Sequence, residues 1–200
     1  MTTTIRNPNT PAGVRILDAA SALFYERGIR AVGVDLIADE AGTTKKTLYD
    51  RFGSKDELVA AYLTRRAARW IDFLTDHLER HAPEPGPGRV LAVMDALEER
   101  MREQDRGCAF VNAYAELGGT DHPGNAVIRE DKRYMRALFV RLVDEAGIPD
   151  AETVGAHAHL LYEGAIVAKT AGGFDGAYGE ARAAMARLLV ASVASHPTAG

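Results

Sequence analysis

Apolar residues recur every three or four positions along almost the entire chain of 200 residues. This is the period of helices that bury one face and leave the other to solvent. The first such face is formed by Ile16, Ala20, Leu23 and Phe24. No segment alternates between apolar and polar positions over the length of a strand, so we predict an all-α fold of about nine helices.

The first quarter of the chain predicts three short helices. The second of them stops at Gly42, and the Thr44 hydroxyl caps the third. Gly53 ends the third helix, and Ser54 forms a capping box with Glu57 that opens a long fourth helix. Two short helices joined by a turn, with a first helix packed behind them, indicate a helix-turn-helix layout.

Five more helices are predicted beyond residues 82–88, where three prolines and two glycines indicate a linker. These helices are expected near residues 90–101, 108–117, 128–142, 151–171 and 180–194. The predicted domain organisation is a flexible tail at 1–12, a helix-turn-helix domain at 13–58 and a larger helical domain at 59–196.

The net charge of −4 at first argues against a nucleic-acid partner. The charge is unevenly distributed, however: residues 1–66 hold ten basic and eight acidic residues, while the rest hold 14 and 20. The footprint of positive charge matters more than the total for a DNA-binding protein. The mildly basic amino-terminal third is therefore compatible with DNA binding.

The stretch GTTKKTLYDRFGSK, residues 42–55, is polar around a single apolar residue, Leu48. In a helix-turn-helix layout the third helix lies in the major groove, so its exposed side chains must be short or positively charged. Threonine hydroxyls can donate to phosphates or base edges, and lysine neutralises phosphate or reaches guanine. Backbone N–H groups near Lys55, at the start of the fourth helix, can hold a phosphate. We interpret the stretch as a DNA-contacting surface that Leu48 anchors in the three-helix core.

Residues 16–59 resemble the amino-terminal domain of the TetR family of transcriptional regulators. The matching elements are ILDAA..LF.ERG in the first helix, IA.EAG in the second, and LY.RFGSK.EL after it. Residues 107–116, GCAFVNAYAE, are similar to one subgroup of TetR carboxy-terminal domains. The resemblance implies a homodimer that binds a pseudo-palindromic, double-stranded DNA operator, with a variable carboxy-terminal domain that binds a small effector.

The resemblance also implies which positions face DNA. The expected DNA-binding residues are Thr43, Thr44, Lys45, Lys46, Thr47, Tyr49 and Lys55, the last on a phosphate. Tyr49 is open to a second interpretation, as half of an aromatic plug with Phe52. Where the family usually has a capping Thr or Ser, Gly33 has no side chain, and Asp35 stands where a basic or neutral residue is common. These departures leave open whether the second helix contacts DNA.

The effector is expected between helices four to eight, in an apolar or aromatic pocket. Its candidate lining residues are Trp70, Met94, Phe110, Asn112, Tyr114, Leu138, Tyr162 and Glu163. Glu163 lies in a nearly apolar stretch, where its carboxylate needs a partner or water. It is open to two interpretations, a polar spot in the pocket or a residue facing solvent.

Small residues in the last two helices allow close helix packing, either within the chain or in a four-helix seam between two subunits. The dimer seam is the favoured interpretation. Its candidate residues are Ala158, Ala165, Ala168, Ala184 and Leu188.

No catalytic set, phosphate-binding loop, metal site or cofactor site is predicted. His77 and His81 have metal-ligand spacing, but a helix end also favours histidine there. The single cysteine, Cys108, the absence of a signal-like amino terminus and the lack of a long apolar run predict a cytoplasmic protein with no membrane partner.

The function expected from these features is that of a ligand-responsive transcriptional regulator, a repressor that a small apolar or aromatic effector releases from its operator. Two alternatives stay open. One is a helical small-molecule-binding protein or enzyme whose helix-turn-helix does not bind DNA. The other is a protein-interaction module that has lost DNA binding, which Gly33 and Asp35 favour and the lysines oppose.

Overall fold

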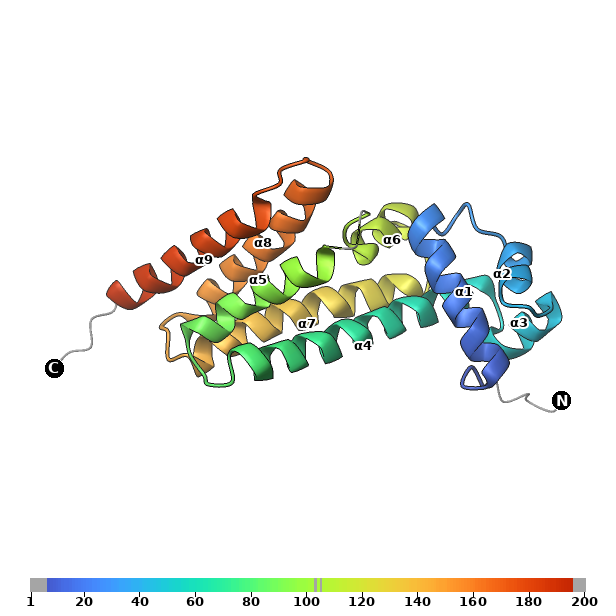
Figure 1. Cartoon of the computed structure of the whole chain (residues 1–200), viewed down its shortest axis with the longest axis horizontal. Helices are drawn as coiled ribbons and strands as arrows, with labels where there is room; N and C mark the ends of the chain where they lie inside the picture. Colours follow the sequence, from blue (N-terminus) through green and yellow to red (C-terminus); the bar gives the residue numbers. More distant parts are fainter. Residues whose placement is uncertain (1–6, 103, 105, 196–200) are drawn as a thin grey trace. The chain divides into compact units, whose positions relative to one another are not determined.

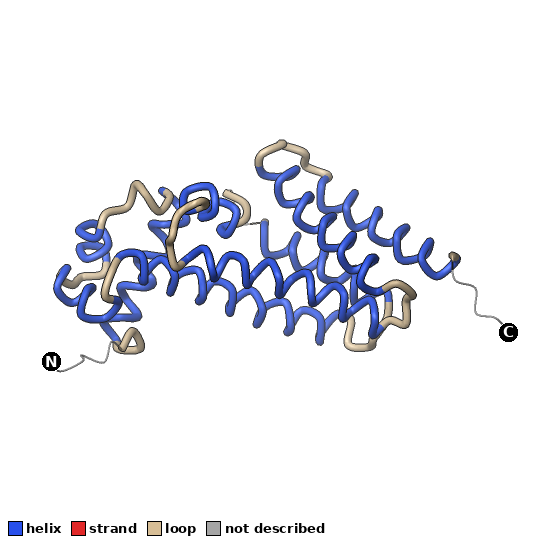
Figure 2. Tube along the Cα trace, turned by 180° about the vertical axis from the view of Figure 1, so that it is seen from behind, coloured by secondary structure: helices blue, strands red, loops and turns tan. Residues whose placement is uncertain are grey.

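A computed structural model describes residues 7–102, 104 and 106–195 of the chain. Within these residues the backbone forms helices and loops and no strands (Figure 2), which confirms the predicted all-α class. The helices are α1 (Pro11–Arg27), α2 (Val34–Glu40), α3 (Lys45–Phe52), α4 (Lys55–His81), α5 (Pro87–Met101), α6 (Ala109–Leu117), α7 (Gly124–Glu145), α8 (Ala151–Thr170) and α9 (Ala177–Ala194) (Figure 1). None of the helices in this described part is long and apolar enough to cross a membrane.

Several helices begin earlier than the sequence predicts, among them α7, which starts at Gly124. Pro87 starts α5 inside the expected linker, because a proline is tolerated in the first turn, where its missing N–H would have no helical partner. Pro11 likewise starts α1 within the expected tail, and the Thr10 side chain accepts the N–H of Gly13 as a cap. Residues 1–6 of that predicted tail lie outside the described residues. Ala177 starts α9 three residues before the expected position.

The chain divides into two compact units. The first consists of the segment up to Ala68 together with Ala109–Glu130, and the second consists of Arg69–Cys108 with the segment from Asp131 onward. The predicted boundary at residue 58 therefore falls inside the first unit. Helix α6, which was expected in the larger carboxy-terminal domain, belongs to the first unit with α1–α3.

The core of the first unit is built where α1, α2 and α3 meet. Ile16, Ile37 and Leu48 are each fully buried there. Leu48 is the apolar position predicted to anchor α3, and its exposed fraction of 0% confirms that role. Gly53 has a φ of 85°, a conformation that favours glycine, and its N–H closes on the carbonyl of Tyr49 to end α3.

The core of the second unit is formed by α5, α8, α9 and the parts of α4 and α7 that belong to this unit. Phe139 on α7 is completely buried in it, as is Met185 on α9. Gly155 lets α8 approach α7 closely, because a Cβ atom there would lie 2.5 Å from the Cα atom of Val140. The guanidinium of Arg182 on α9 donates to both carboxylate oxygens of Asp95 on α5, at 2.6 and 3.1 Å, which adds a polar contact at the edge of this core.

A cluster of ionisable groups lies between α7 and α8. Lys132 donates to Glu163 at 2.9 Å, and its ammonium is also 3.5 Å from the carboxylate of the buried Asp131. His159 approaches Glu163 at 3.4 Å. Glu163 is half-buried and has charged partners within its own chain, and its place as a polar spot in a ligand pocket stays a prediction.

The pKa values of the cluster follow from burial and pairing. Burial acts to raise the pKa of Glu163, but the hydrogen bond to His159 and the ammonium of Lys132 outweigh it, so the pKa is lowered. Burial also acts to lower the pKa of Lys132, yet the nearby negative groups raise it above its usual value. The Lys132–Glu163 pair is therefore ionised on both sides at neutral pH.

Replacing the cation of this pair should destabilise the protein. We expect Lys132→Met to lower the free energy of unfolding at pH 7 by about 2–4 kcal/mol, because it leaves a largely buried carboxylate without its counter-charge. The measurement is urea unfolding followed by circular dichroism. Lys132→Met with Glu163→Gln should regain most of the loss, since the amide carries no charge.

The same variant has a defined pH dependence. The lowered pKa of Glu163 contributes stability above about pH 4.5, the range in which an unfolded glutamate ionises, and this stability is lost as pH falls through the lowered pKa. The difference between the parent protein and Lys132→Met should therefore shrink near pH 4. An equal difference at pH 4 and pH 7 would contradict the assignment of this pair.

Candidate nucleic-acid interface

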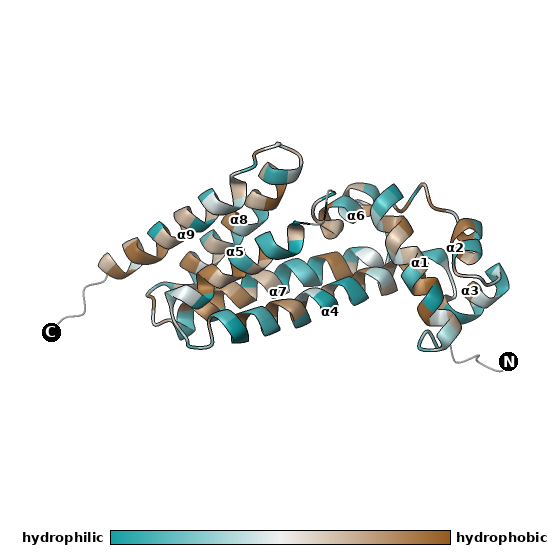
Figure 3. Ribbon diagram, in the orientation of Figure 1, coloured by the Kyte–Doolittle hydropathy of each residue, from teal (hydrophilic) through white to brown (hydrophobic). Residues whose placement is uncertain are grey.

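Helix α3 presents a polar face to solvent. Lys45, Lys46, Tyr49 and Asp50 are exposed along it, whereas Phe52 is buried with Leu48. Tyr49 is 44% exposed, which places its ring at the surface and not in an aromatic plug with Phe52. Figure 3 draws α3 mainly in teal and white, the colours of hydrophilic and neutral residues. The face has the composition expected of a surface that contacts a polar partner.

The amino-terminal end of α3 is fixed by threonine hydroxyls. The Oγ1 atom of Thr44 accepts the backbone N–H of Thr47 at 3.1 Å and lies 3.0 Å from the Thr47 hydroxyl. The backbone N–H of Thr43 donates to the carbonyl of Ala38 at 2.9 Å and closes the turn between α2 and α3. Thr44 therefore caps the helix as predicted, and its hydroxyl is exposed at the start of the candidate interface.

Two lysines on this face have carboxylate partners. The Nζ atom of Lys45 lies 2.6 Å from Asp35 on α2, and that of Lys46 lies 3.0 Å from Asp50 on α3. All four side chains are at least half exposed. Gly33 forms the N-cap of α2 without a side-chain hydrogen bond, so Asp35 is the acidic group in the first turn of that helix.

The side chain of Lys55 is directed into the protein. Its ammonium donates to the carbonyl of Ile29 at 2.7 Å and lies 6.0 Å from the centre of the Phe24 ring. Burial lowers the pKa of this ammonium, opposed by Asp56 and Glu116. The Lys55 ammonium thus has an internal partner in this structure, and its contact with a phosphate stays a prediction.

The loop between α1 and α2 is held from the other side by α6. The two carboxylate oxygens of Glu116 accept the backbone N–H groups of Ile29 at 2.9 Å and Arg30 at 2.7 Å. The Arg30 guanidinium returns a bond to the carbonyl of Glu116 at 2.6 Å. The backbone of Ile29 thus lies between two charged groups: its N–H donates to the Glu116 carboxylate, and its carbonyl accepts from the Lys55 ammonium. The sequence did not indicate this arrangement.

Several predicted pocket residues belong to the core of the second unit. Met94, Leu138 and Tyr162 are buried there, and Trp70 packs against that core with its indole N–H 3.2 Å from the sulfur of Met135. Burial raises the pKa of Tyr162. These four residues do come together, but Glu163 is occupied by its ion pair with Lys132.

The other predicted pocket residues lie on α6, in the first unit. Phe110 is buried, Asn112 is half-buried, and Tyr114 is 55% exposed. The predicted lining set is therefore divided between the two units. A single apolar pocket that includes both groups stays a prediction.

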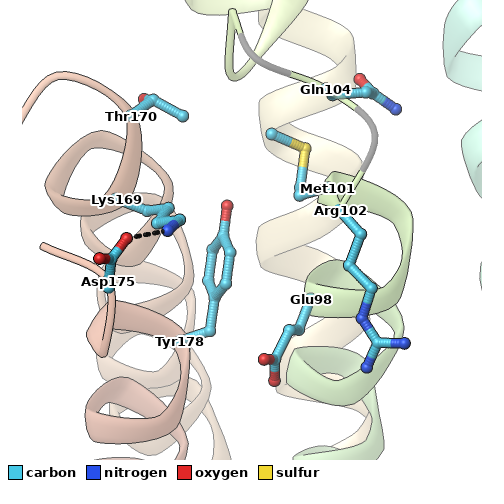
Figure 4. Close-up of a pocket in the computed structure, with 8 residues that line it drawn as sticks. All are labelled: Glu98, Met101, Arg102, Gln104, Lys169, Thr170, Asp175 and Tyr178. Atoms are coloured by element: carbon cyan, nitrogen blue, oxygen red, sulfur yellow. Dashed lines mark hydrogen bonds and ion pairs between the residues drawn. The ribbon is translucent and has the colours of Figure 1, made fainter. Parts of the chain in front are cut away.

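A different, polar cleft of about 430 Å³ occurs in the second unit, near the carboxy-terminal ends of α5 and α8. Figure 4 shows Glu98, Arg102 and Met101 on one side of it, with the Lys169–Asp175 ion pair on the other and Tyr178 between them. None of the predicted pocket residues lines this cleft. No periodic or motif signal in the sequence marks this cleft, because its walls come from the ends of helices.

Two residues of the predicted dimer interface need correction. Ala158 and Ala165 are 0% and 4% exposed in the single chain, so their side chains pack within the subunit and have no surface to offer a partner. Ala168, Ala184 and Leu188 are half-buried. The exposed side of α8 and α9 instead carries large apolar residues, including Leu160 at 66% and Val190 at 70%.

Histidine and cysteine positions show structural roles. His77 is buried and its Nδ1 atom lies 3.0 Å from Glu99, and its ring lies tilted against that of His81, with the ring centres 4.4 Å apart. Cys108 lies 3.6 Å from the ammonium of Lys132. Over the described ranges, no three His, Cys, Asp or Glu side chains are grouped so that they could hold a metal ion.

Comparison with known proteins supports the assignment of the amino-terminal unit. Residues 16–62 match the family model described as "Bacterial regulatory proteins, tetR family". The HTH-type transcriptional activator FasR of Mycolicibacterium smegmatis is 47% identical over 106 residues, which cover 53% of this chain and 48% of that protein. The HTH-type transcriptional repressor KstR2 of Mycobacterium tuberculosis is 42% identical over 90 residues, 42% of each chain. The matched region thus spans about half the length of these curated relatives.

Solved structures extend the similarity along most of the chain. A TetR-family transcriptional regulator from Streptomyces coelicolor has a TM-score of 0.78 and 29% identity, over 92% of this chain and 95% of that one. A putative TetR transcriptional regulator from Streptomyces avermitilis has the same score and identity, over 92% and 98%. The helical arrangement of the amino-terminal unit is therefore also found in these two transcriptional regulators.

The Glu116 contacts can be tested directly. We expect Glu116→Ala to accelerate hydrogen exchange at the amides of Ile29 and Arg30, and to lower the free energy of unfolding by about 1–3 kcal/mol, because two charge-assisted hydrogen bonds are lost. Amide exchange followed by NMR is the measurement. Glu79→Ala, which removes an exposed glutamate from α4, should change neither quantity. Unaltered exchange at both amides would mean that the carboxylate does not hold this loop.

Proposed function

This chain belongs to the TetR family of bacterial regulatory proteins, and from that membership we propose that it is a ligand-responsive, DNA-binding transcriptional regulator. The observation that carries the proposal is the exposed polar face of α3, held in place by the buried Leu48 and by the Thr44 cap. A helix of this kind at the surface of a helix-turn-helix is the element that enters the major groove.

The proposed contacts are divided by chemistry. Lys45 binds the phosphate backbone, and Lys46 and Thr47 reach base edges. In this proposal the hydroxyls of Thr43, Thr44 and Tyr49 donate to phosphate. Lys55 is left out of this set, because its ammonium bonds to the Ile29 carbonyl.

The proposed assembly is a homodimer on a pseudo-palindromic operator. Two copies of α3 would then lie in successive major grooves, roughly 34 Å apart or a multiple of that distance. The exposed apolar side of α8 and α9 supports this assembly, because large apolar residues at a surface favour burial against a partner. The proposed seam therefore includes Leu160, Val167 and Val190 in place of Ala158 and Ala165.

We assign a small effector to the carboxy-terminal helices, where Trp70 and Tyr162 are the aromatic candidates. An effector changes DNA binding only through its different affinity for the two states of the protein. We propose repression as the activity, as in the name of KstR2, although FasR is named an activator. A reporter gene behind the selected operator distinguishes the two, because a repressor lowers its expression and an activator raises it.

DNA binding itself is tested by selection from a random pool of duplexes, which should enrich a pseudo-palindromic sequence. On that sequence, Lys45→Ala should weaken binding about equally for all base variants and reduce the slope of log affinity against log salt by about one unit per subunit. Lys46→Ala should cost about 1–3 kcal/mol per half-site and relax preference at one base pair. Fluorescence anisotropy across a salt series measures both.

Arg136→Ala, an exposed cation in the second unit, is the control and should leave affinity and slope unchanged. A pool that yields no enriched sequence would refute the proposal. It would favour the alternative of a helical small-molecule-binding protein or enzyme whose helix-turn-helix does not bind DNA.

The dimer seam is tested by placing charge on the exposed apolar side of α8 and α9. Leu160→Arg and Val190→Arg should each give monomers in sedimentation velocity, because an unpaired charge would be buried at the seam. Val14→Arg introduces the same charge at an exposed apolar position of α1 and should leave the mass unchanged. Dimers in both seam variants would place the interface elsewhere.

A further inference from the structure

The exposed face of α3, together with the neighbouring Asp35 on α2, is called the reading surface below. It carries two lysines, Lys45 and Lys46, and two carboxylates, Asp35 and Asp50. Asp35 and Asp50 lie 2.6 and 3.0 Å from the ammonium groups of Lys45 and Lys46, so each cation has an anion in contact. The pairs are solvent-exposed, with the Lys46 side chain 84% accessible. The formal charge of this four-residue set is zero, although the surface is proposed to meet a polyanion.

A carboxylate at this place has two effects on DNA binding. It neutralises the lysine beside it, and it repels any phosphate that approaches within a Debye length, which is about 8–10 Å at physiological salt. Both effects act on the sugar–phosphate backbone, which is the same for every sequence. They therefore weaken non-specific binding, which rests almost entirely on phosphate neutralisation.

Binding to the correct sequence is affected less. A lysine that finds a guanine edge exchanges its carboxylate partner for base acceptors, and an exposed ion pair costs little to break. On an incorrect sequence the lysine has no such replacement and keeps its carboxylate. Because Lys46 is the lysine proposed to reach a base edge, its partner Asp50 changes the ratio of specific to non-specific affinity. That ratio decides how a regulator is distributed over a genome.

Helix stability explains one of these carboxylates better than the other. Asp35 lies in the first turn of α2, where a negative charge favours the helix. Asp50 lies in the carboxy-terminal half of α3, where the same charge is unfavourable for the helix. Its contact with Lys46, one turn earlier on the exposed face, gives it a role on the reading surface instead.

We propose that Asp50 is a specificity-determining residue that suppresses non-specific DNA binding through Lys46, and that Asp35, through the phosphate-binding Lys45, weakens binding to every sequence alike. The inference rests on the proposed DNA-binding function. It assigns the two carboxylates no direct contact with DNA. Their effect is electrostatic, so it disappears at high salt.

The test uses the full-length protein with Asp35→Asn, Asp50→Asn and the double variant. Two probes are needed: a random-sequence duplex of about 30 bp, and the duplex enriched by selection from a random pool. Each single variant should bind the random duplex about 10-fold more tightly at low salt, from roughly 3-fold per subunit in a dimer. In Asp50→Asn, binding to the enriched duplex should tighten by less than about 3-fold, so the specificity ratio falls. In Asp35→Asn, both duplexes should gain affinity about equally, because Lys45 contacts phosphate on every sequence.

The salt series gives an independent readout. Freeing one lysine in each subunit should steepen the slope of log affinity against log salt on the random duplex by about one unit per subunit. Asp76→Asn removes an exposed carboxylate from an i,i+4 pair with Arg80 in the second unit, and so changes the net charge equally. This control should leave both the ratio and the slope unchanged.

A combined variant separates neutralisation of the lysine from repulsion of phosphate. In a Lys45→Gln background, Asp35→Asn can act only by removing repulsion, so its effect on the random duplex should be smaller than in the parent protein. Thermal unfolding of each variant verifies that it is folded, and Asp50→Glu, which keeps the charge, should keep the parent ratio.

The outcomes are distinct. Selective DNA binding with an unchanged specificity ratio in Asp50→Asn would overturn the inference and leave the proposed function intact. Loss of preference at one base pair in Asp50→Asn would also overturn it for that residue, because it would indicate direct acceptance from a cytosine amino group. If the parent protein binds neither duplex, both the inference and the proposed function fail.

Discussion

The burial of Leu48 between α3 and the two helices before it determines how the amino-terminal unit presents its surface. Because this one side chain, with Phe52 at the helix end, provides the apolar contact of α3, the remaining positions are free of any packing requirement. They can carry threonine, lysine and tyrosine at no cost to the core. Such polar residues would destabilise a helix in the protein interior. On α3 they lie at the surface, where they are compatible with a stable fold and can contact a partner.

The elements that could be predicted from sequence are those determined by residues close together in the chain. The Thr44 cap, the stop at Gly53 and the burial of Leu48 each depend on a turn or two of helix, so their signals are local. The contacts of the Ile29 peptide are different. Its partners, Lys55 and Glu116, are 26 and 87 residues away, and neither has a local pattern that marks it. Periodicity places such residues on helices but does not pair them.

Helix α8 shows why the second half of the chain was harder to interpret. It is apolar on two sides, since Ala158 and Ala165 face the core while Leu160 and Val167 face outward. A periodic pattern identifies a buried face only where the opposite face is polar. Small residues were assigned to the subunit seam, yet they line the interior, where Gly155 lets α8 approach α7 closely. Similarly, Glu163 looked unpartnered because its cation lies on another helix.

Helix α6 carries residues of two different roles. The helix carries Phe110 and Tyr114, which were predicted to meet an effector, and it also carries Glu116, which holds the amides of Ile29 and Arg30. The held loop leads directly into α2, whose Asp35 pairs with Lys45 on α3. A displacement of α6 must therefore either carry this loop with it or break the charge-assisted bonds.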